Sequence, residues 1–372
     1  MNRRGFLTRG LVLPLLGSVS APLQSKELVS ASEDTFHQGL FASAFTDANK
    51  QHHIGLLNHQ GQLLWQKPLN ERAHAPVFHP TQPIVAIVSR RPGFFITVYN
   101  TITGKHVNQI TPSNGHHFYG HAVFSADGNR LITQENHYDS GEGKVFVRDW
   151  LNGRILNEWP SYGIGPHQSC LLNGTTLVVA NGGLRTHPDN DRTILNMDSM
   201  QPNVAFISLE DGRLLHKVTH SSDLHQLSIR HLDINSDGKV ALAFQYQGQK
   251  WEAVPLVGIA SLGSEKIDYL PMPEPIRQQF KQYCGSVRFD ASGNVLAVTT
   301  PRGGLVAFWS IKEHVFLSTN VLRDVCGVKA SNKPHEFILS TGRGKLFHIN
   351  IMEETARLVQ KFDKVHWDNH LT

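Results

Sequence analysis

Four histidines stand at matching positions in the sequence. Three of them lie seven residues before a glycine: His121 before Gly128, His167 before Gly174 and His231 before Gly238. His74 lies ten residues before Ile84, as His121 lies ten residues before Leu131. Neutral imidazole is a common protein ligand for zinc, copper, nickel and iron. If the fold brings these side chains to one place, they offer a transition-metal or haem site.

Short strands in a repeat must position these histidines. Residues 121–134 (HAVFSADGNRLITQ) alternate apolar side chains, turn at Asp127-Gly128 and resume, which predicts an antiparallel hairpin. Residues 143–150 and 154–159 supply a third and a fourth strand, and four such strands make one propeller blade. The pattern recurs at residues 72–88, 165–183, 228–248, 284–300 and 326–351. We predict an all-β fold, a seven-bladed β-propeller. A β-sandwich with an appended barrel explains the unbroken repeat less well.

The seventh blade requires both ends of the repeat. Residues 40–69 hold only three strands, and the tail Val365–Leu371 follows the last complete blade without a partner. We hypothesise that the tail is the missing inner strand, which pairs into the first blade and closes the ring. This closure would leave no open sheet edge in the ring.

Inner strands of successive blades point equivalent residues toward one mouth of the central channel. His74, His121, His167 and His231 would therefore meet there, and His370 would be a fifth, since it follows Trp367 much as His121 follows Tyr119. Ser286 and Gly327 hold the equivalent positions of the last two blades, so the histidines would lie on one side. The alternative is that each histidine donates a hydrogen bond to the backbone of a neighbouring blade and ties blades together.

Other polar residues could serve the same mouth. Glu135 and Asn136 end a second strand and could supply oxygen ligands or orient the histidines. Arg72, Arg185 and Arg230 could make an anion site, or could pair with local carboxylates.

Two further features stay open at this level. Cys284 and Cys326 each precede a glycine on adjacent blades, which allows a disulfide, a pair of soft-metal ligands or two buried thiols. The polar insertion between Gly183 and Pro202 is long for a hairpin connection, and it either covers the channel mouth or pads the surface.

The N-terminus is typical of an export signal. Asn2-Arg3-Arg4-Gly5-Phe6-Leu7 precedes an apolar run from Leu11 to Val19 and a stretch of small residues. The paired arginines predict a twin-arginine signal in residues 1–30, with a general secretory signal as the alternative. We expect residues 31–372 to form a single propeller domain located in the periplasm, without stable membrane insertion once the signal is removed.

Composition and motifs exclude several classes of protein. The formal net charge is +4, and the Lys and Arg residues are scattered, so a nucleic-acid partner is not expected. The sequence contains no nucleophile elbow, phosphate-binding loop, HExxH motif or dinucleotide fingerprint.

Several motifs resemble the family called domain of unknown function 1513, a family of bacterial propeller-like proteins exported by the twin-arginine route. They are HFYGHAVFSADG, YGIGPH, VVANGG with THPDNDR and LNMDSM, LSIRHL, RGG, CGV and WDNHL, between Leu40 and Leu371. The motif positions carried over are His121, His167, Thr186-His187-Pro188, Arg230-His231 and Asn369-His370. Genes of that family tend to lie beside those of imelysin-like proteins and di-haem cytochromes linked to periplasmic iron handling. The resemblance therefore implies such proteins as partners.

These observations lead to one expected function and two alternatives. We expect a periplasmic propeller that binds iron or copper at the histidine-lined mouth, for metal acquisition or redox handling. A non-catalytic interaction scaffold with structural histidines is the first alternative. A metal-dependent oxidoreductase or lyase is the second, so the sequence leaves open whether the protein is an enzyme.

Overall fold

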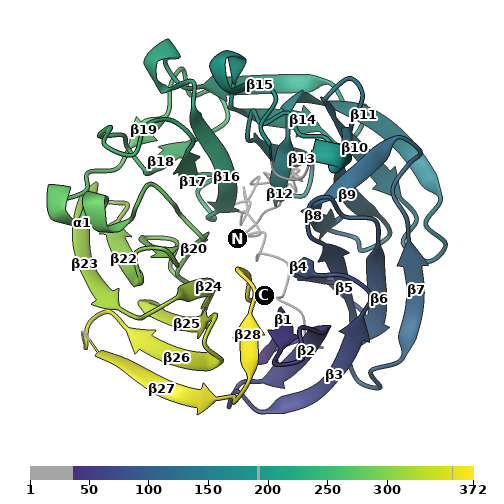
Figure 1. Cartoon of the computed structure of the whole chain (residues 1–372), viewed down its shortest axis with the longest axis horizontal. Helices are drawn as coiled ribbons and strands as arrows, with labels where there is room; N and C mark the ends of the chain where they lie inside the picture. The colour runs from purple at the N-terminus through teal and green to yellow at the C-terminus, as the bar shows by residue number, and fades with distance from the viewer. Residues whose placement is uncertain (1–36, 191–192, 354) are drawn as a thin grey trace, which may run out of the picture. The chain divides into compact units, whose positions relative to one another are not determined.

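Short strands separated by turns pair into seven antiparallel sheets of four strands each in the described part of the chain, and the sheets form a ring (Figure 1). The computed structural model describes residues 37–190, 193–353 and 355–372, which belong to one compact unit, Asp34–Thr372. The prediction of a seven-bladed β-propeller is confirmed.

We number the blades in chain order, from the innermost strand outward. Blade 1 contains β28 (Val365–Trp367), β1 (Leu40–Asp47), β2 (His52–Asn58) and β3 (Leu63–Leu69), and blade 2 contains β4 (Ala73–Phe78), β5 (Ile84–Ser89), β6 (Ile96–Asn100) and β7 (His106–Ile110). Blade 3 contains β8 (His116–Phe124), β9 (Leu131–His137), β10 (Glu142–Arg148) and β11 (Ile155–Ile164), and blade 4 contains β12 (Pro166–Leu172), β13 (Thr176–Asn181), β14 (Asn203–Ser208) and β15 (Leu214–Thr219). Blade 5 contains β16 (Leu227–Ile234), β17 (Val240–Tyr246), β18 (Val257–Ala260) and β19 (Asp268–Tyr269). Blade 6 contains β20 (Ser286–Phe289), β21 (Val295–Thr300), β22 (Leu305–Ser310) and β23 (Val315–Val321), and blade 7 contains β24 (Val325–Ala330), β25 (Glu336–Thr341), β26 (Lys345–Asn350) and β27 (Thr355–Lys361).

Short helices lie only in connections among the described residues. They are the α-helix α1 (Glu274–Gln279) and the 3₁₀ turns η1 (Pro188–Asn190), η2 (Met197–Ser199) and η3 (Ser222–Leu224). The turns η1 and η2 belong to the insertion of blade 4.

The inner hairpin turn requires a residue with positive φ. Gly128 has φ +73°, a conformation that side-chain-bearing residues rarely adopt. A Cβ added there would lie 2.2 Å from the His79 ring on blade 2. The Asp-Gly turn that the sequence predicts is therefore required both by the backbone and by the packing of neighbouring blades.

The C-terminal tail closes the ring. Strand β28 is the innermost strand of blade 1 and pairs antiparallel with β1, with Trp367 opposite Phe45. Figure 1 shows β28 beside β1, so the last and first parts of the described chain share one sheet. The closure hypothesis is confirmed.

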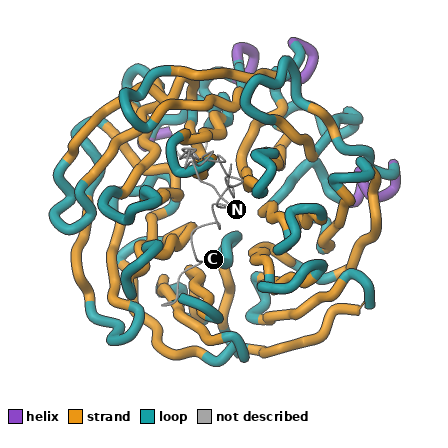
Figure 2. The backbone as a smooth tube through the Cα atoms, turned by 180° about the vertical axis from the view of Figure 1, so that it is seen from behind, coloured by secondary structure: helices purple, strands orange, loops and turns teal. Residues whose placement is uncertain are grey.

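The hydrophobic core lies between the faces of neighbouring blades. Phe45 and Trp367 of blade 1 belong to the same buried cluster as Cys326 and Ile338 of blade 7. The outermost strands are more exposed than the inner ones, as the alternating pattern of β3 shows. Figure 2 shows the blades arranged around the ring. Burial of apolar side chains between neighbouring blades stabilises this arrangement.

The predicted signal in residues 1–30 lies outside the described residues. Within the described residues, no helix has the length and apolar character needed to cross a membrane.

Candidate metal centre

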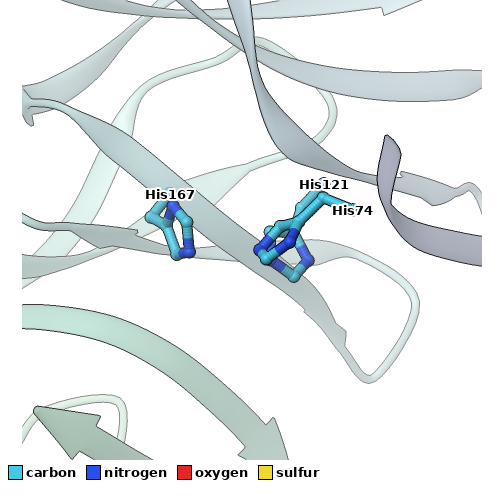
Figure 3. Close-up of side chains that lie close together, drawn as sticks. All are labelled: His74, His121 and His167. Atoms are coloured by element: carbon cyan, nitrogen blue, oxygen red, sulfur yellow. The ribbon is translucent and has the colours of Figure 1, made fainter. Parts of the chain in front are cut away.

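Five histidines converge at the inner edges of blades 1 to 5. His74, His121, His167 and His231 lie on the inner strands β4, β8, β12 and β16, and His370 follows β28. Ring centroids are 4.9 Å apart for His74 and His121, 5.0 Å for His121 and His167, and 4.9 Å for His167 and His231. The His370 ring lies 4.4 Å from His74 and 4.5 Å from His121. We call these five residues the histidine cluster, and Figure 3 shows three of them.

A local irregularity of the inner strand accompanies each histidine. In blades 2 to 5 the pairing with the second strand shifts register between Ala73 and Pro76, Phe118 and Ala122, Pro166 and Gln168, and Ile229 and His231. A bulge leaves a residue outside the regular ladder and re-aims its side chain. By contrast, β20 pairs with β21 from Ser286 to Phe289 without a shift. The inner strand of blade 7 also shifts register, between Val325 and Val328, where no histidine lies. Each of the four histidines therefore lies at a bulge, but a bulge is not confined to the histidine-bearing blades.

The tail presents His370 in a similar way. The Asp368 amide donates to the Ala44 carbonyl at 2.9 Å, and the Thr372 amide donates to the Ala42 carbonyl at 3.1 Å. Residues 369–371 thus lie opposite a single residue of β1, Ser43, whose hydroxyl donates to the His370 carbonyl at 2.7 Å. This extra chain length turns His370 away from the ladder.

The imidazole nitrogens of the histidine cluster form two groups that share His121. One nitrogen from each of His74, His121 and His167 lies within 4.8 Å of the other two, and the same holds for His121, His231 and His370. His74 Nε2 and His370 Nε2 are 3.1 Å apart. Two imidazole nitrogens bound to one tetrahedral ion at about 2.05 Å would lie about 3.3 Å apart. The His74–His370 contact, which is also a hydrogen bond, therefore has a spacing close to that of two ligands of one ion, and it joins the two groups.

Burial keeps the cluster neutral. All five side chains are buried. Burial lowers the pKa of His74 to about 4, against the opposing hydrogen bond and charge of Asp368. Burial, followed by the charges of neighbouring histidines and arginines, holds the pKa of His121, His167, His231 and His370 well below the ordinary value. Neutral imidazole is the form that binds metal, so these nitrogens are in the required state at neutral pH.

Asp368 orients His74. Its Oδ1 lies 2.9 Å from His74 Nδ1, and its two oxygens accept hydrogen bonds from Arg72 and Arg90. Burial opposes ionisation of Asp368, but His74 and the two arginines outweigh it and keep its pKa below the usual range. With its Nδ1 proton donated to a carboxylate, His74 presents the Nε2 lone pair, the arrangement found around many metal-bound histidines. Sequence reasoning missed this residue, although it lies two positions before His370.

Two cluster nitrogens have no hydrogen-bond partner among the described residues: His121 Nε2 and His167 Nδ1. His231 Nδ1 contacts the Gln168 side chain, 3.1 Å away on blade 4. In the described part of the chain, no imidazole of the cluster donates to the backbone of a neighbouring blade. The geometry therefore differs from that of backbone ties between blades.

Glu135 and Asn136 engage other groups. Glu135 Oε1 accepts from Arg148 at 2.6 Å and from Thr133 at 2.9 Å. The Asn136 side-chain amide contacts His117 Nε2 and the Thr186 carbonyl. These contacts place Glu135 in the packing of blade 3 and Asn136 between blade 3 and the insertion of blade 4, whereas the five histidines contact one another.

The three predicted arginines occupy three different environments. Arg72 pairs with Asp368 at 2.7 Å, and Arg185 donates to the Asp139 carbonyl at 2.7 Å. Arg230 lines a cavity of about 220 Å³ beside the cluster, together with His74, His167 and His231. Burial, and then the charges of Arg91 and Arg90, lower the pKa of Arg230 to about 9, so its guanidinium stays charged at neutral pH.

The insertion of blade 4 contributes to the same cavity, since Leu184 and Ile194 line it.

Both Cys284 and Cys326 are free and buried. Burial raises the pKa of each thiol to about 12. Among the possibilities that the sequence left open, the structure has two buried thiols.

Comparisons with known proteins agree with this fold. The model of the family described as "Protein of unknown function (DUF1513)" matches residues 67–372. Among solved structures, the chain is similar to the "Crystal Structure Of The C-Terminal WD40 Domain Of Sif2", with a TM-score of 0.54 and 11% sequence identity over 85% of this chain and 80% of that chain. At this identity the likeness concerns the fold alone. A search of the curated proteins found no match.

Proposed function

We propose, from the premise that this chain belongs to the DUF1513 family, that it is a periplasmic propeller whose histidine cluster binds a transition-metal ion, iron or copper. The proposed role is metal acquisition or redox handling. The imelysin-like and di-haem cytochrome partners implied by the family resemblance are part of the same proposal.

The observation that carries the proposal is two groups of three buried, neutral imidazoles that share His121, with His121 Nε2 and His167 Nδ1 unpartnered among the described residues. Leaving a buried polar atom without a partner costs about 1–3 kcal/mol. A bound metal ion would satisfy these nitrogens. An all-imidazole donor set suits iron, copper, zinc and nickel rather than magnesium or calcium.

In this proposal each side chain has a separate task. Asp368 holds the Nδ1 proton of His74, so that its Nε2 faces His370. The Gln168 side-chain oxygen, a neutral acceptor, plays the same part for the Nδ1 of His231. His121 belongs to both ligand groups, so it is the ligand whose loss should matter most.

Elemental analysis by mass spectrometry tests the proposal on untagged protein purified after native export. The wild type should retain near-stoichiometric iron or copper, and His121→Leu should lose it, since both ligand groups contain His121. His117→Leu is the matched control, because His117 is equally buried on the same strand but lies outside both groups. Absence of metal from the wild type would contradict the proposal and favour the interaction scaffold.

The proposed export route has its own test. The double substitution Arg3→Lys, Arg4→Lys keeps the positive charge and removes the paired arginines. Fractionation should find the variant in the cytoplasm and the wild type in the periplasm. An exported variant would instead favour the general secretory signal.

A further inference from the structure

The cavity beside the histidine cluster is rich in positive charge. Four arginines line it, Arg90, Arg91, Arg230 and Arg302, together with the histidines His74, His167 and His231. No described residue that lines the cavity has an acidic side chain. Asp368, which accepts from Arg72 and Arg90 and lies against His74, neutralises part of the charge beside the cavity. The described lining of the cavity itself therefore carries arginines without an acidic side chain.

Arg230 is a buried arginine whose side-chain donors are not all satisfied by the described residues. It is 8% exposed, and its Nε and Nη1 have no hydrogen-bond partner among the described residues. By contrast, the buried Arg148 binds Glu135 at 2.6 Å, and the partly exposed Arg288 binds Asp233 at 2.8 Å. A buried charge without a partner is strongly unfavourable unless a ligand supplies the counter-charge.

The remaining lining residues indicate what kind of anion fits. Guanidinium groups bind carboxylates and phosphates through paired N–H donors. Gln245, Gln247 and Asn369 add neutral polar groups, whereas Leu184 and Ile194 add an apolar wall. An apolar wall favours an anion with a carbon skeleton over an inorganic ion. A volume of about 220 Å³ admits a small molecule only.

We propose that this cavity is a binding site for a small organic di- or tricarboxylate, held by Arg230 and Arg302 beside the histidine cluster. Arg230, Arg302 and the cavity carry this inference by themselves, so it does not rest on the proposed metal-binding function. Because His74, His167 and His231 line the same cavity, a carboxylate bound there would lie next to the imidazole nitrogens.

Isothermal titration calorimetry on the metal-free full chain tests this site with citrate, succinate and inorganic phosphate. Citrate or succinate should bind, and phosphate should bind more weakly. Arg230→Gln should weaken binding about 10- to 100-fold, the effect of losing a charge-assisted hydrogen bond. Arg185→Gln should bind as the wild type does, because Arg185 does not line the cavity.

Arg302→Gln is a second variant that tests the same site if Arg230→Gln does not fold. Arg302 is exposed and lies over the Tyr283 ring at 4.1 Å, so its substitution should leave folding intact and weaken binding several-fold, by about 3- to 10-fold. The proposal is overturned if neither carboxylate binds, if the arginine substitutions leave carboxylate binding unchanged, or if phosphate binds more tightly than both carboxylates. A protein that retains metal but binds no carboxylate would overturn this inference alone.

Discussion

Blades 2 to 5 and blades 6 and 7 follow one backbone plan but place different residues on the inner strand. On the first side the inner strands carry histidines, and His121 Nε2 and His167 Nδ1 lack partners among the described residues. On the other side two inner polar groups have partners: Thr299 Oγ1 donates to the Cys326 carbonyl at 2.6 Å, and the Gly327 amide donates to Ser340 Oγ at 3.2 Å. The contrast teaches that the same backbone plan can pair the polar groups near the channel within the chain or leave imidazole nitrogens without partners among the described residues.

The tail is the element that both sides share. Asp368 orients His74 on the histidine side, and its carbonyl lies 3.2 Å from Cys326 Sγ on blade 7. A Cβ added to Gly327 would lie 2.8 Å from the Leu371 amide nitrogen, so blade 7 needs a glycine where the tail passes.

Deletion of residues 365–372 should give the largest effect, because it removes β28 from blade 1 and separates the two sides. We expect loss of cooperative unfolding, since the inner edge of β1 and the apolar contacts of Trp367 become exposed. Differential scanning calorimetry measures this. Unchanged melting of the truncated protein would contradict the closure.

Asp368→Asn should destabilise the protein by about 3 kcal/mol, the lower end of the range for breaking a buried ion pair, because Arg72 is half-exposed. Urea unfolding measures the change. Asp363→Asn, at an exposed site in the same segment, should change the free energy of unfolding by less than about 0.5 kcal/mol. Equal effects of the two substitutions would show that the tail carboxylate has no special role.

The pH dependence of stability should separate the histidine side from the rest. Burial lowers the pKa of His167 in the folded protein, so below about pH 6.5 the unfolded chain binds a proton that the folded protein does not. In metal-free protein the free energy of unfolding should therefore be constant above pH 6.5 and fall below it, by up to about 1.4 kcal/mol per pH unit for each such histidine. His167→Leu should lower the slope of the free energy of unfolding against pH by the contribution of one histidine. Urea unfolding between pH 7 and 5 measures this slope. An unchanged slope would mean that His167 is already protonated in the folded state.

Substitutions on the two sides should have small effects of opposite sign. In metal-free protein His167→Leu should stabilise by about 1 kcal/mol, because it removes a buried, unpartnered nitrogen without a large change of volume. Thr299→Val should destabilise by about 1 kcal/mol, because it leaves the Cys326 carbonyl without its donor. Chemical denaturation of both variants checks the signs. A destabilising His167→Leu would indicate that this histidine is structural.

The sequence by itself predicts the seven blades, the closure by the tail and the meeting of His74, His121, His167, His231 and His370. These features depend on strand alternation, turn glycines and a repeated spacing, which are local in the chain. Because a repeat places equivalent residues at equivalent positions, the common spacing of four histidines is enough to predict that they meet.

Only the tertiary structure decides which polar groups find partners. Asp368 meets His74 across 294 positions, and Glu135 is bound by Arg148 in its own blade. Arg230 is adjacent to His231 in sequence, yet nothing in the sequence distinguishes it from the paired Arg288. The reason is physical: whether a charge is buried, and whether a counter-charge reaches it, depends on contacts between blades that no local pattern encodes.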